Sequence, residues 1–251
     1  METLYLLTLA LGPAFILVHL LWSHDRFREP YGNLSLYLLL GAASVVPTVL
    51  VEMIVVPIWP ELFGSLLGAV LTAFLGVALV EEGFKLLFLR WRARRDAHLD
   101  EPFDWVVYAV SVSLGFAAVE NVLYVMEHGA ATGWLRALTA VPCHALFGTV
   151  MGAYLAKTFH ARGSTPAGWF ALFMPTLWHG AYDAPLFLME VGAPAGVCIT
   201  IWLLVVALLW RTAVRQLRQL RVVQDFPAPP LLDPLHTPQV LLRRGRANTN
   251  S

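Results

Sequence analysis

The sequence predicts an all-α protein, a polytopic membrane helical bundle with about seven transmembrane helices. Of its 251 residues, 58% are hydrophobic and only 14% are charged, whereas a soluble domain carries about 25% charged residues. The apolar residues also gather in runs of about 20, the length that an α-helix needs to cross a bilayer. This composition excludes an ordinary cytosolic enzyme and most nucleic-acid-binding proteins. Two cysteines, both within apolar runs, exclude a disulfide scaffold.

Seven apolar segments are the predicted membrane spans. They cover residues 4–22, 34–59, 62–89, 105–126, 134–159, 167–189 and 191–210. We expect a single transmembrane domain at residues 1–212, with a four-helix core at about 62–190. A basic and Pro-rich cytoplasmic tail is expected at 213–251.

The Lys and Arg residues predict the orientation of the chain. With seven spans, one side of the membrane holds twelve of them and the other holds only Arg136, so the basic side is expected to be cytoplasmic and the N-terminus outside. The twelve are Arg26, Arg28, Arg90, Arg92, Arg94, Arg95, Lys157, Arg162, Arg211, Arg215, Arg218 and Arg221.

Polar and ionisable side chains inside four consecutive spans predict a functional site. Such a group at mid-bilayer costs at least a few kcal/mol, so it indicates function by default. We expect Glu52 to be a helix-end or loop residue and His19 to be interfacial, so neither belongs to the predicted site. The candidate residues are Glu81, Glu82, Lys85, Glu120, Asn121, His144, His179 and Asp183.

Helical spacing predicts how some of these side chains pair. Adjacent residues point about 100° apart, so we expect that Glu81 and Glu82 do not both face one point. Lys85 follows them by four and three residues and can pair with either. His179 and Asp183 share a face, where a carboxylate orients an imidazole.

Small residues predict close helix packing around the site. His144 is followed at four-residue steps by Gly148 and Gly152, and Gly115 lies near Glu120 in the preceding span. Such residues let neighbouring membrane helices approach closely.

The ordered set of motifs resembles the PrsW family of bacterial intramembrane proteases. The family pattern is Glu-Glu-x-x-Lys, then Phe-x-x-x-Glu-Asn, then a His, then His-x-x-x-Asp. The resemblance covers roughly residues 76–188. In the related CAAX prenyl endopeptidases and bacteriocin-immunity membrane proteins, the second motif usually ends in His, where this chain has Glu120. The matching residues are Glu81, Glu82, Lys85, Phe116, Glu120, Asn121, His144, His179 and Asp183.

This resemblance implies a hydrolase of the bacterial cytoplasmic (inner) membrane that cuts a membrane-anchored protein. The best-known family role is the first cleavage of a membrane-spanning anti-sigma factor, which releases an extracytoplasmic-function sigma factor. The expected partners are therefore a single-pass membrane protein substrate and the lipid bilayer, without nucleic acid.

In the first chemical interpretation, a carboxylate activates water and no cofactor takes part. Glu82 or Glu81 is the expected general base, and Glu120 shares the water or holds the proton. At 1.5 Å per residue, Glu82 lies roughly 10 Å and Glu120 roughly 22 Å from the cytoplasmic ends of their spans. Either the span boundaries are shifted, or the third span is tilted and displaced, or these two carboxylates do not meet.

Four further residues are expected to assist this chemistry. His144 and His179 would donate to the oxyanion or to the leaving group, with Asp183 orienting His179. Asn121 would add an amide donor.

The second interpretation uses zinc. His144, His179 and a carboxylate of Glu120 or Glu82 would make the three-ligand set of a catalytic zinc site. The sequence has no His-Glu-x-x-His motif, which leaves both interpretations open. A non-catalytic scaffold (a pseudoprotease) and a proton-coupled carrier are the competing function classes.

Overall fold

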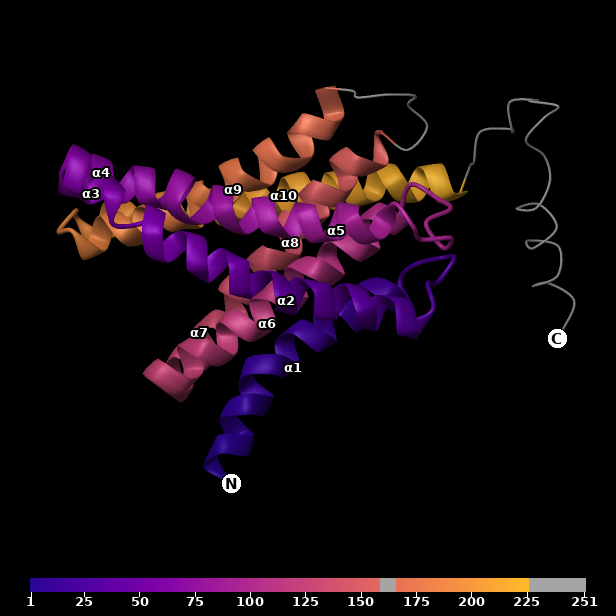
Figure 1. The fold of residues 1–251 in the computed structure, drawn as a ribbon, viewed down its shortest axis with the longest axis horizontal. Helices are drawn as coiled ribbons and strands as arrows, with labels where there is room; N and C mark the ends of the chain where they lie inside the picture. Colours follow the sequence, from indigo (N-terminus) through magenta and orange to yellow (C-terminus); the bar gives the residue numbers. More distant parts are fainter. Residues whose placement is uncertain (159–165, 226–251) are drawn as a thin grey trace, which may run out of the picture.

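The computed structural model describes residues 1–158 and 166–225, and within this part of the chain it is a helical bundle without strands. The fold class predicted from composition is confirmed. Figure 1 shows the arrangement of the helices. The elements are α1 (Glu2–Ser23), α2 (Tyr31–Val55), α3 (Ile58–Phe63), α4 (Ser65–Leu71), the π-helix η1 (Thr72–Ala78), α5 (Leu79–Ala93), α6 (Asp104–His128), α7 (Ala130–Leu138), α8 (Ala140–Ala156), α9 (Pro166–Glu190) and α10 (Ala195–Asp225).

Six helical stretches among the described residues are long and apolar enough to cross a membrane. The sixth predicted span, 167–189, is the one outside this set, and it corresponds to α9, which has 25 residues but contains two prolines, His179 and Asp183. These residues lower its hydropathy below that of the other spans. The six stretches are Glu2–Ser23, Tyr31–Phe63, Ser65–Ala93, Asp104–His128, Ala130–Ala156 and Ala195–Val222.

Helix breaks divide two of the predicted spans. Gly64 has φ +76° and separates α3 from α4, because glycine adopts this left-handed conformation without a Cβ clash. Thr139 interrupts the predicted span 134–159 between α7 and α8. The bundle therefore contains shorter helices at one end.

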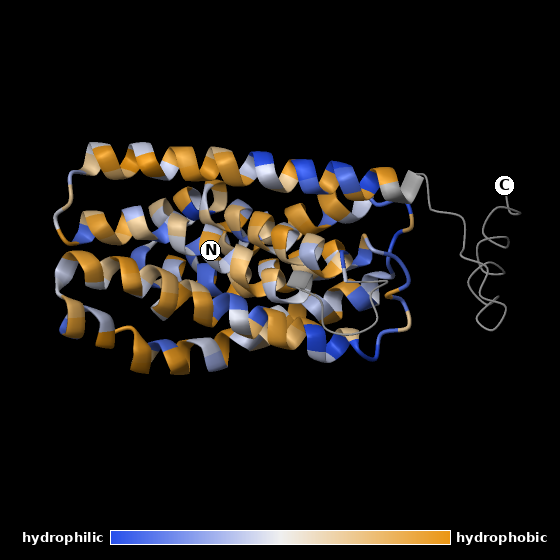
Figure 2. Ribbon diagram, turned by 90° about the horizontal axis from the view of Figure 1, so that it is seen from above, coloured by the Kyte–Doolittle hydropathy of each residue, from blue (hydrophilic) through white to orange (hydrophobic). Residues whose placement is uncertain are grey.

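Helix α10 continues past the boundary that we placed after residue 212. It runs unbroken to Asp225, and Figure 2 shows its change from hydrophobic to hydrophilic residues along one straight helix. The boundary expected after residue 212 thus falls inside a continuous helix, because the Arg-rich segment keeps good helix formers. Arg162 and the tail from residue 226 lie outside the described residues.

Burial separates core helices from peripheral ones. In the spanning part of α6, 78% of the residues are buried, compared with 17% in α10 and 22% in α1. The shares for Ser65–Ala93 and Ala130–Ala156 are 44% and 67%, so these spans of the expected core are also more buried than α1 and α10. The second span is as exposed as α1, at 22%, yet α2 packs closely on α6 and carries one wall residue of the site, described below.

Glycines bring the core helices into backbone contact. A Cβ added at Gly41 of α2 would lie 1.9 Å from the carbonyl oxygen of Val112, and one at Gly115 of α6 would lie 2.0 Å from that of Leu38. Across α6 and α8, a Cβ at Gly152 would lie 2.5 Å from the Cα of Val106. The small residues that predicted close packing thus lie at helix contacts.

A polar cluster closes the end of the bundle where loops 24–30 and 94–103 lie (Figure 1). Asp96 accepts hydrogen bonds from Asn33 Nδ2 at 2.9 Å and from the Tyr37 hydroxyl at 2.8 Å, and Arg92 lies 3.5 Å away. Burial alone would raise the pKa of Asp96, but these partners and the backbone N–H of His98 lower it below its ordinary value. The Asp96 carboxylate therefore fastens the loop to α2.

We expect Gly41→Ala to destabilise the protein by about 2–3 kcal/mol, since the added methyl group forces α2 away from α6. Gly32→Ala in the same helix is the control, because nothing lies within 4 Å of a Cβ there. Thermal unfolding in detergent measures both variants. Equal melting temperatures would show that the α2–α6 contact is not tight.

Asp96→Asn should lower the melting temperature at neutral pH, while Asp100→Asn in the same loop should not. Because the folded-state pKa of Asp96 is lowered, its stabilisation is fully present above the ordinary value of 3.8 and is lost as the pH falls through the lower folded value. The difference between wild type and Asp96→Asn should therefore shrink on acidification below that value. A difference that is independent of pH would contradict this assignment.

Candidate active site

The centre of the site is the ammonium group of Lys85, which is fully buried on α5. Its Nζ donates hydrogen bonds to Glu81 Oε2 at 2.9 Å and to Glu82 Oε1 at 2.8 Å. It also lies 3.1 Å from His144 Nδ1 and 4.1 Å from the centre of the Phe116 ring. Three helices, α5, α6 and α8, therefore converge on one positive charge.

The expectation that Glu81 and Glu82 do not face one point was wrong. Both carboxylates contact Lys85, and His179 Nδ1 lies 3.0 Å from Glu82 Oε1 and 3.9 Å from Glu81 Oε2. The directions of the two Cα–Cβ bonds do differ, but a glutamate side chain has three rotatable bonds and reaches around the helix. The two acids therefore act on one place.

His179 connects this centre to α9. Its Nδ1 faces Glu82, and its Nε2 lies 3.3 Å from Asp183 Oδ2, one helical turn further along. The Phe147 ring stacks on the imidazole at 4.6 Å between centres. The imidazole is thus held at both nitrogens and on one face.

Glu120 is connected to the centre through His144. His144 Nε2 lies 3.0 Å from Glu120 Oε2, while its Nδ1 faces Lys85. The difference in depth between Glu82 and Glu120 is thus bridged by Lys85 and His144. Lys85 donates to Nδ1, so the ring hydrogen belongs on Nε2, where it can be donated to Glu120.

Arg136, on α7, is a site residue that sequence reasoning did not identify. Its Nη2 lies 2.9 Å from Glu120 Oε2, and its Nε donates to Asn121 Oδ1 at 3.0 Å. The available signal was its isolation, since it was the one basic residue on its side of the predicted membrane. We had interpreted it only as evidence of orientation.

Asn121 does not offer its amide to the cavity. The side chain is fully buried, and Nδ2 donates to the carbonyl oxygen of Ala10 at 2.9 Å, while Oδ1 accepts from Arg136. Its amide therefore joins α6 to α1 and positions Arg136. The expected role as an amide donor does not agree with this placement.

A polar cavity of about 740 Å³ lies beside these residues. Glu52, in the last turn of α2, lines it, and its buried Oε1 has no hydrogen-bond partner among the described residues. Glu52 is thus a helix-end residue as expected, but the expectation that it lies outside the site was wrong. The charged residues that share this wall with Glu52 come from other helices, which a sequence pattern does not reveal. The ionisable side chains on the wall are Glu52, Glu81, Glu120, Arg136, His144, His179, Asp183 and Glu190.

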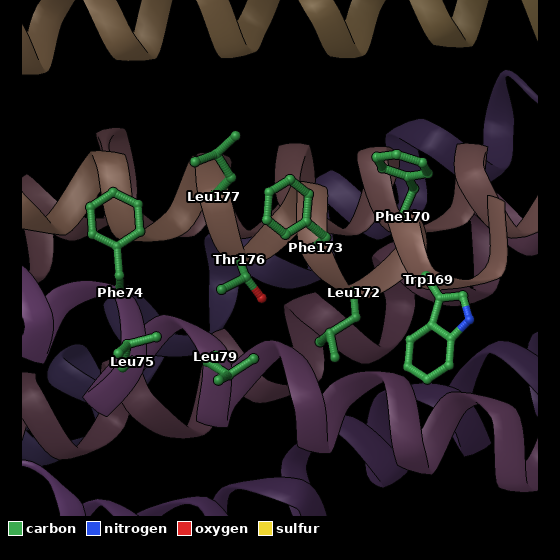
Figure 3. Close-up of a pocket in the computed structure, with 9 residues that line it drawn as sticks. All are labelled: Phe74, Leu75, Leu79, Trp169, Phe170, Leu172, Phe173, Thr176 and Leu177. Carbon is green, nitrogen blue, oxygen red and sulfur yellow. The ribbon is translucent and has the colours of Figure 1, made fainter. Parts of the chain in front are cut away.

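A separate apolar cavity of about 560 Å³ lies between η1 and α9 (Figure 3). Thr176 is the one polar side chain on its wall. Phe74 packs against Gly180, where a Cβ would lie 2.3 Å from the ring, directly beside His179. This cavity holds no acid or base and is not the site of chemistry.

The site contains the ligand types of a zinc centre but not an open arrangement for the ion. Glu81, His144 and His179 each offer a donor atom within 4.8 Å of the others, with Glu81 in place of the expected Glu120 or Glu82. However, both nitrogens of His179 face carboxylates, and those of His144 face Lys85 and Glu120. Because a metal needs a free imidazole lone pair, these residues do not fit a metal as they are arranged here.

Arg136→Gln should destabilise the protein by about 1.5–3 kcal/mol, because Glu120 loses its cationic partner and Asn121 loses a charged hydrogen-bond donor. Arg94→Gln, at an exposed position beyond α5, is the matched control. Thermal unfolding in detergent compares them. If both variants melt like wild type, the Arg136–Glu120 pair does not stabilise the fold.

Comparison with known proteins identifies the family. The model of the "PrsW family intramembrane metalloprotease" matches residues 29–210. "Protease PrsW" of Bacillus subtilis (strain 168) is 33% identical over 181 residues, which cover 71% of this chain and 81% of the relative. The protein of the same name from Oceanobacillus iheyensis is 30% identical over 217 residues, or 86% of this chain and 96% of the relative. No solved structure matches. The chain therefore belongs to the PrsW family and is a membrane peptidase.

Proposed function

We propose that this protein is an endopeptidase that cleaves a membrane-anchored protein, such as an anti-sigma factor, by glutamate-activated water. The observation that carries the proposal is the placement of Glu81 on the wall of the polar cavity, next to a buried Lys85 and His179. Membership in a protease family supports a hydrolase over a scaffold or a proton-coupled carrier.

Glu81 is our candidate for the general base, and Glu82 for a positioning residue. Glu81 lines the cavity, whereas Glu82 is fully buried behind it and holds Lys85 and His179 through one oxygen. A carboxylate in contact with the cavity can accept a proton from water, and a buried one orients its neighbours.

The remaining wall residues supply charge and protons. Water attacks the peptide carbonyl as Glu81 takes one of its protons, and Arg136 on the cavity wall stabilises the oxyanion. When the C–N bond breaks, His179 gives its Nε2 proton to the leaving amine, since its 3.3 Å contact with Asp183 is the looser one. The proton on Glu81 then returns to the vacated Nε2 of His179 through water in the cavity that both residues line. This cycle restores both groups.

We infer that the chain lies in the bacterial cytoplasmic membrane with its N-terminus outside and its C-terminus in the cytoplasm. The Arg-containing loops 24–30 and 94–103 and the hydrophilic end of α10 lie at one end of the bundle (Figures 1 and 2), which supports a cytoplasmic end. The cavity is lined by residues of α7 and by Glu190 at the end of α9, so it lies toward the opposite end. Cleavage is therefore expected in the outer part of the membrane.

Glu81→Gln should reduce cleavage by about 10³-fold, because it removes a general base and keeps the shape of the side chain. Its melting temperature should fall less than that of Glu82→Gln, because Glu81 holds Lys85 alone, whereas Glu82 holds both Lys85 and His179. Glu82→Gln should reduce both activity and melting temperature, since Lys85 and His179 lose a charged acceptor. The assay is cleavage of a single-pass substrate in proteoliposomes.

Glu61→Gln, at an exposed position on α3, is the control and should cleave like wild type. Full activity of Glu81→Gln together with a stable but inactive Glu82→Gln would move the base to Glu82. Wild-type cleavage by both variants would contradict the carboxylate mechanism.

A further inference from the structure

We propose that the ammonium group of Lys85 is the resident cation of this site, and that it excludes a divalent metal ion from the donor group of Glu81, His144 and His179. The inference rests on the proposed carboxylate chemistry and extends it. It disagrees with the metalloprotease description of the family.

The surroundings of Lys85 are those of a bound cation. Two carboxylate oxygens lie 2.9 and 2.8 Å from Nζ, an imidazole nitrogen lies at 3.1 Å, and the face of Phe116 lies at 4.1 Å. These are oxygen, nitrogen and π donors arranged around one positive charge that is fully buried. Two of the three donor residues that could hold a metal, Glu81 and His144, contact this ammonium.

A metal ion and Lys85 compete for the same electron pair. The Nδ1 atom of His144 has one lone pair, and it accepts either an N–H of Lys85 or a metal. The Nε2 atom faces Glu120 and is the donor side of the ring. A zinc ligand bond is about 2.0–2.3 Å long, so an ion on these atoms would also face a like charge at short range.

His179 offers no replacement for this ligand. Its two nitrogens face Glu82 and Asp183, so both carry hydrogen when they donate to these carboxylates. Removal of the Lys85 charge would free the lone pair of His144 and leave Glu81 and Glu82 without their shared cation. The vacated position should then take a divalent ion.

The test is the binding of Co²⁺ to the full-length protein in detergent. Wild type, Lys85→Met and the control Lys157→Met are compared by visible absorption of bound Co²⁺ and by metal content per chain. Lys157 is the other lysine of the chain and is exposed at the end of α8. We expect Lys85→Met to bind one Co²⁺ at least about 100-fold more tightly than wild type, because a like charge has been removed. Lys157→Met should behave like wild type, and adding His144→Ala to Lys85→Met should abolish binding.

The proposal is overturned if wild type binds one Co²⁺ as tightly as Lys85→Met and loses it in His144→Ala. If Lys85→Met does not fold, the double variant Lys85→Met/Glu82→Gln replaces it, because Glu82→Gln removes one of the two buried carboxylate charges that have lost their cation. The Co²⁺ titration of wild type tests the proposal even without either variant. Cleavage assays separate this inference from the proposed function. If wild type binds Co²⁺ through His144 and cleaves substrate, the inference about Lys85 is wrong but the proposed function stands. If wild type neither binds Co²⁺ nor cleaves substrate, the proposed function is wrong but the inference about Lys85 stands.

Discussion

The buried charge of Lys85 is the constraint on which the rest of this site depends. An ammonium ion is stable in an apolar bundle only when opposite charges and hydrogen-bond acceptors surround it. Here the acceptors come from α5 itself and from α8, and the ring of Phe116 on α6 covers the remaining face. The core helices therefore assemble around the charge, and the reactive carboxylates are placed by the same contacts that hold the fold.

Charged groups farther from Lys85 are also surrounded by opposite charges or hydrogen-bond partners. Glu120 lies between His144 and Arg136, and at the far end of the bundle Asp96 lies between hydrogen-bond donors from α2 and the side chain of Arg92. Polar groups have no water to bind in the hydrocarbon region, so a partner on a neighbouring helix, as for Glu120, fixes how the two helices pack. Glycine contacts between α2 and α6 and between α6 and α8 bring the backbones close enough for these short polar contacts to form.

Contacts within one helix were predictable from the sequence, and contacts between helices were not. The spacing of Lys85 after Glu81 and of Asp183 after His179 follows from the helical repeat, and both pairs are present. Glu52 shares the cavity wall with residues of other helices, and Arg136 pairs with two residues of α6. The place of both depends on the rotation and tilt of each helix. These two variables leave no periodic trace in a chain that is apolar on nearly every face.

The π-helix η1 has a consequence for the comparison of related sequences. Each of its turns closes through an i→i+5 hydrogen bond and so contains about one residue more than an α-helical turn. It lies directly before the α5 turn that carries Glu81 and Glu82. In a relative that is α-helical throughout this segment, the acidic pair points in the same direction when the segment is one residue shorter. Alignments of such sequences therefore need a single-residue gap within 72–78, inside a continuous membrane helix, where alignment methods place gaps most reluctantly.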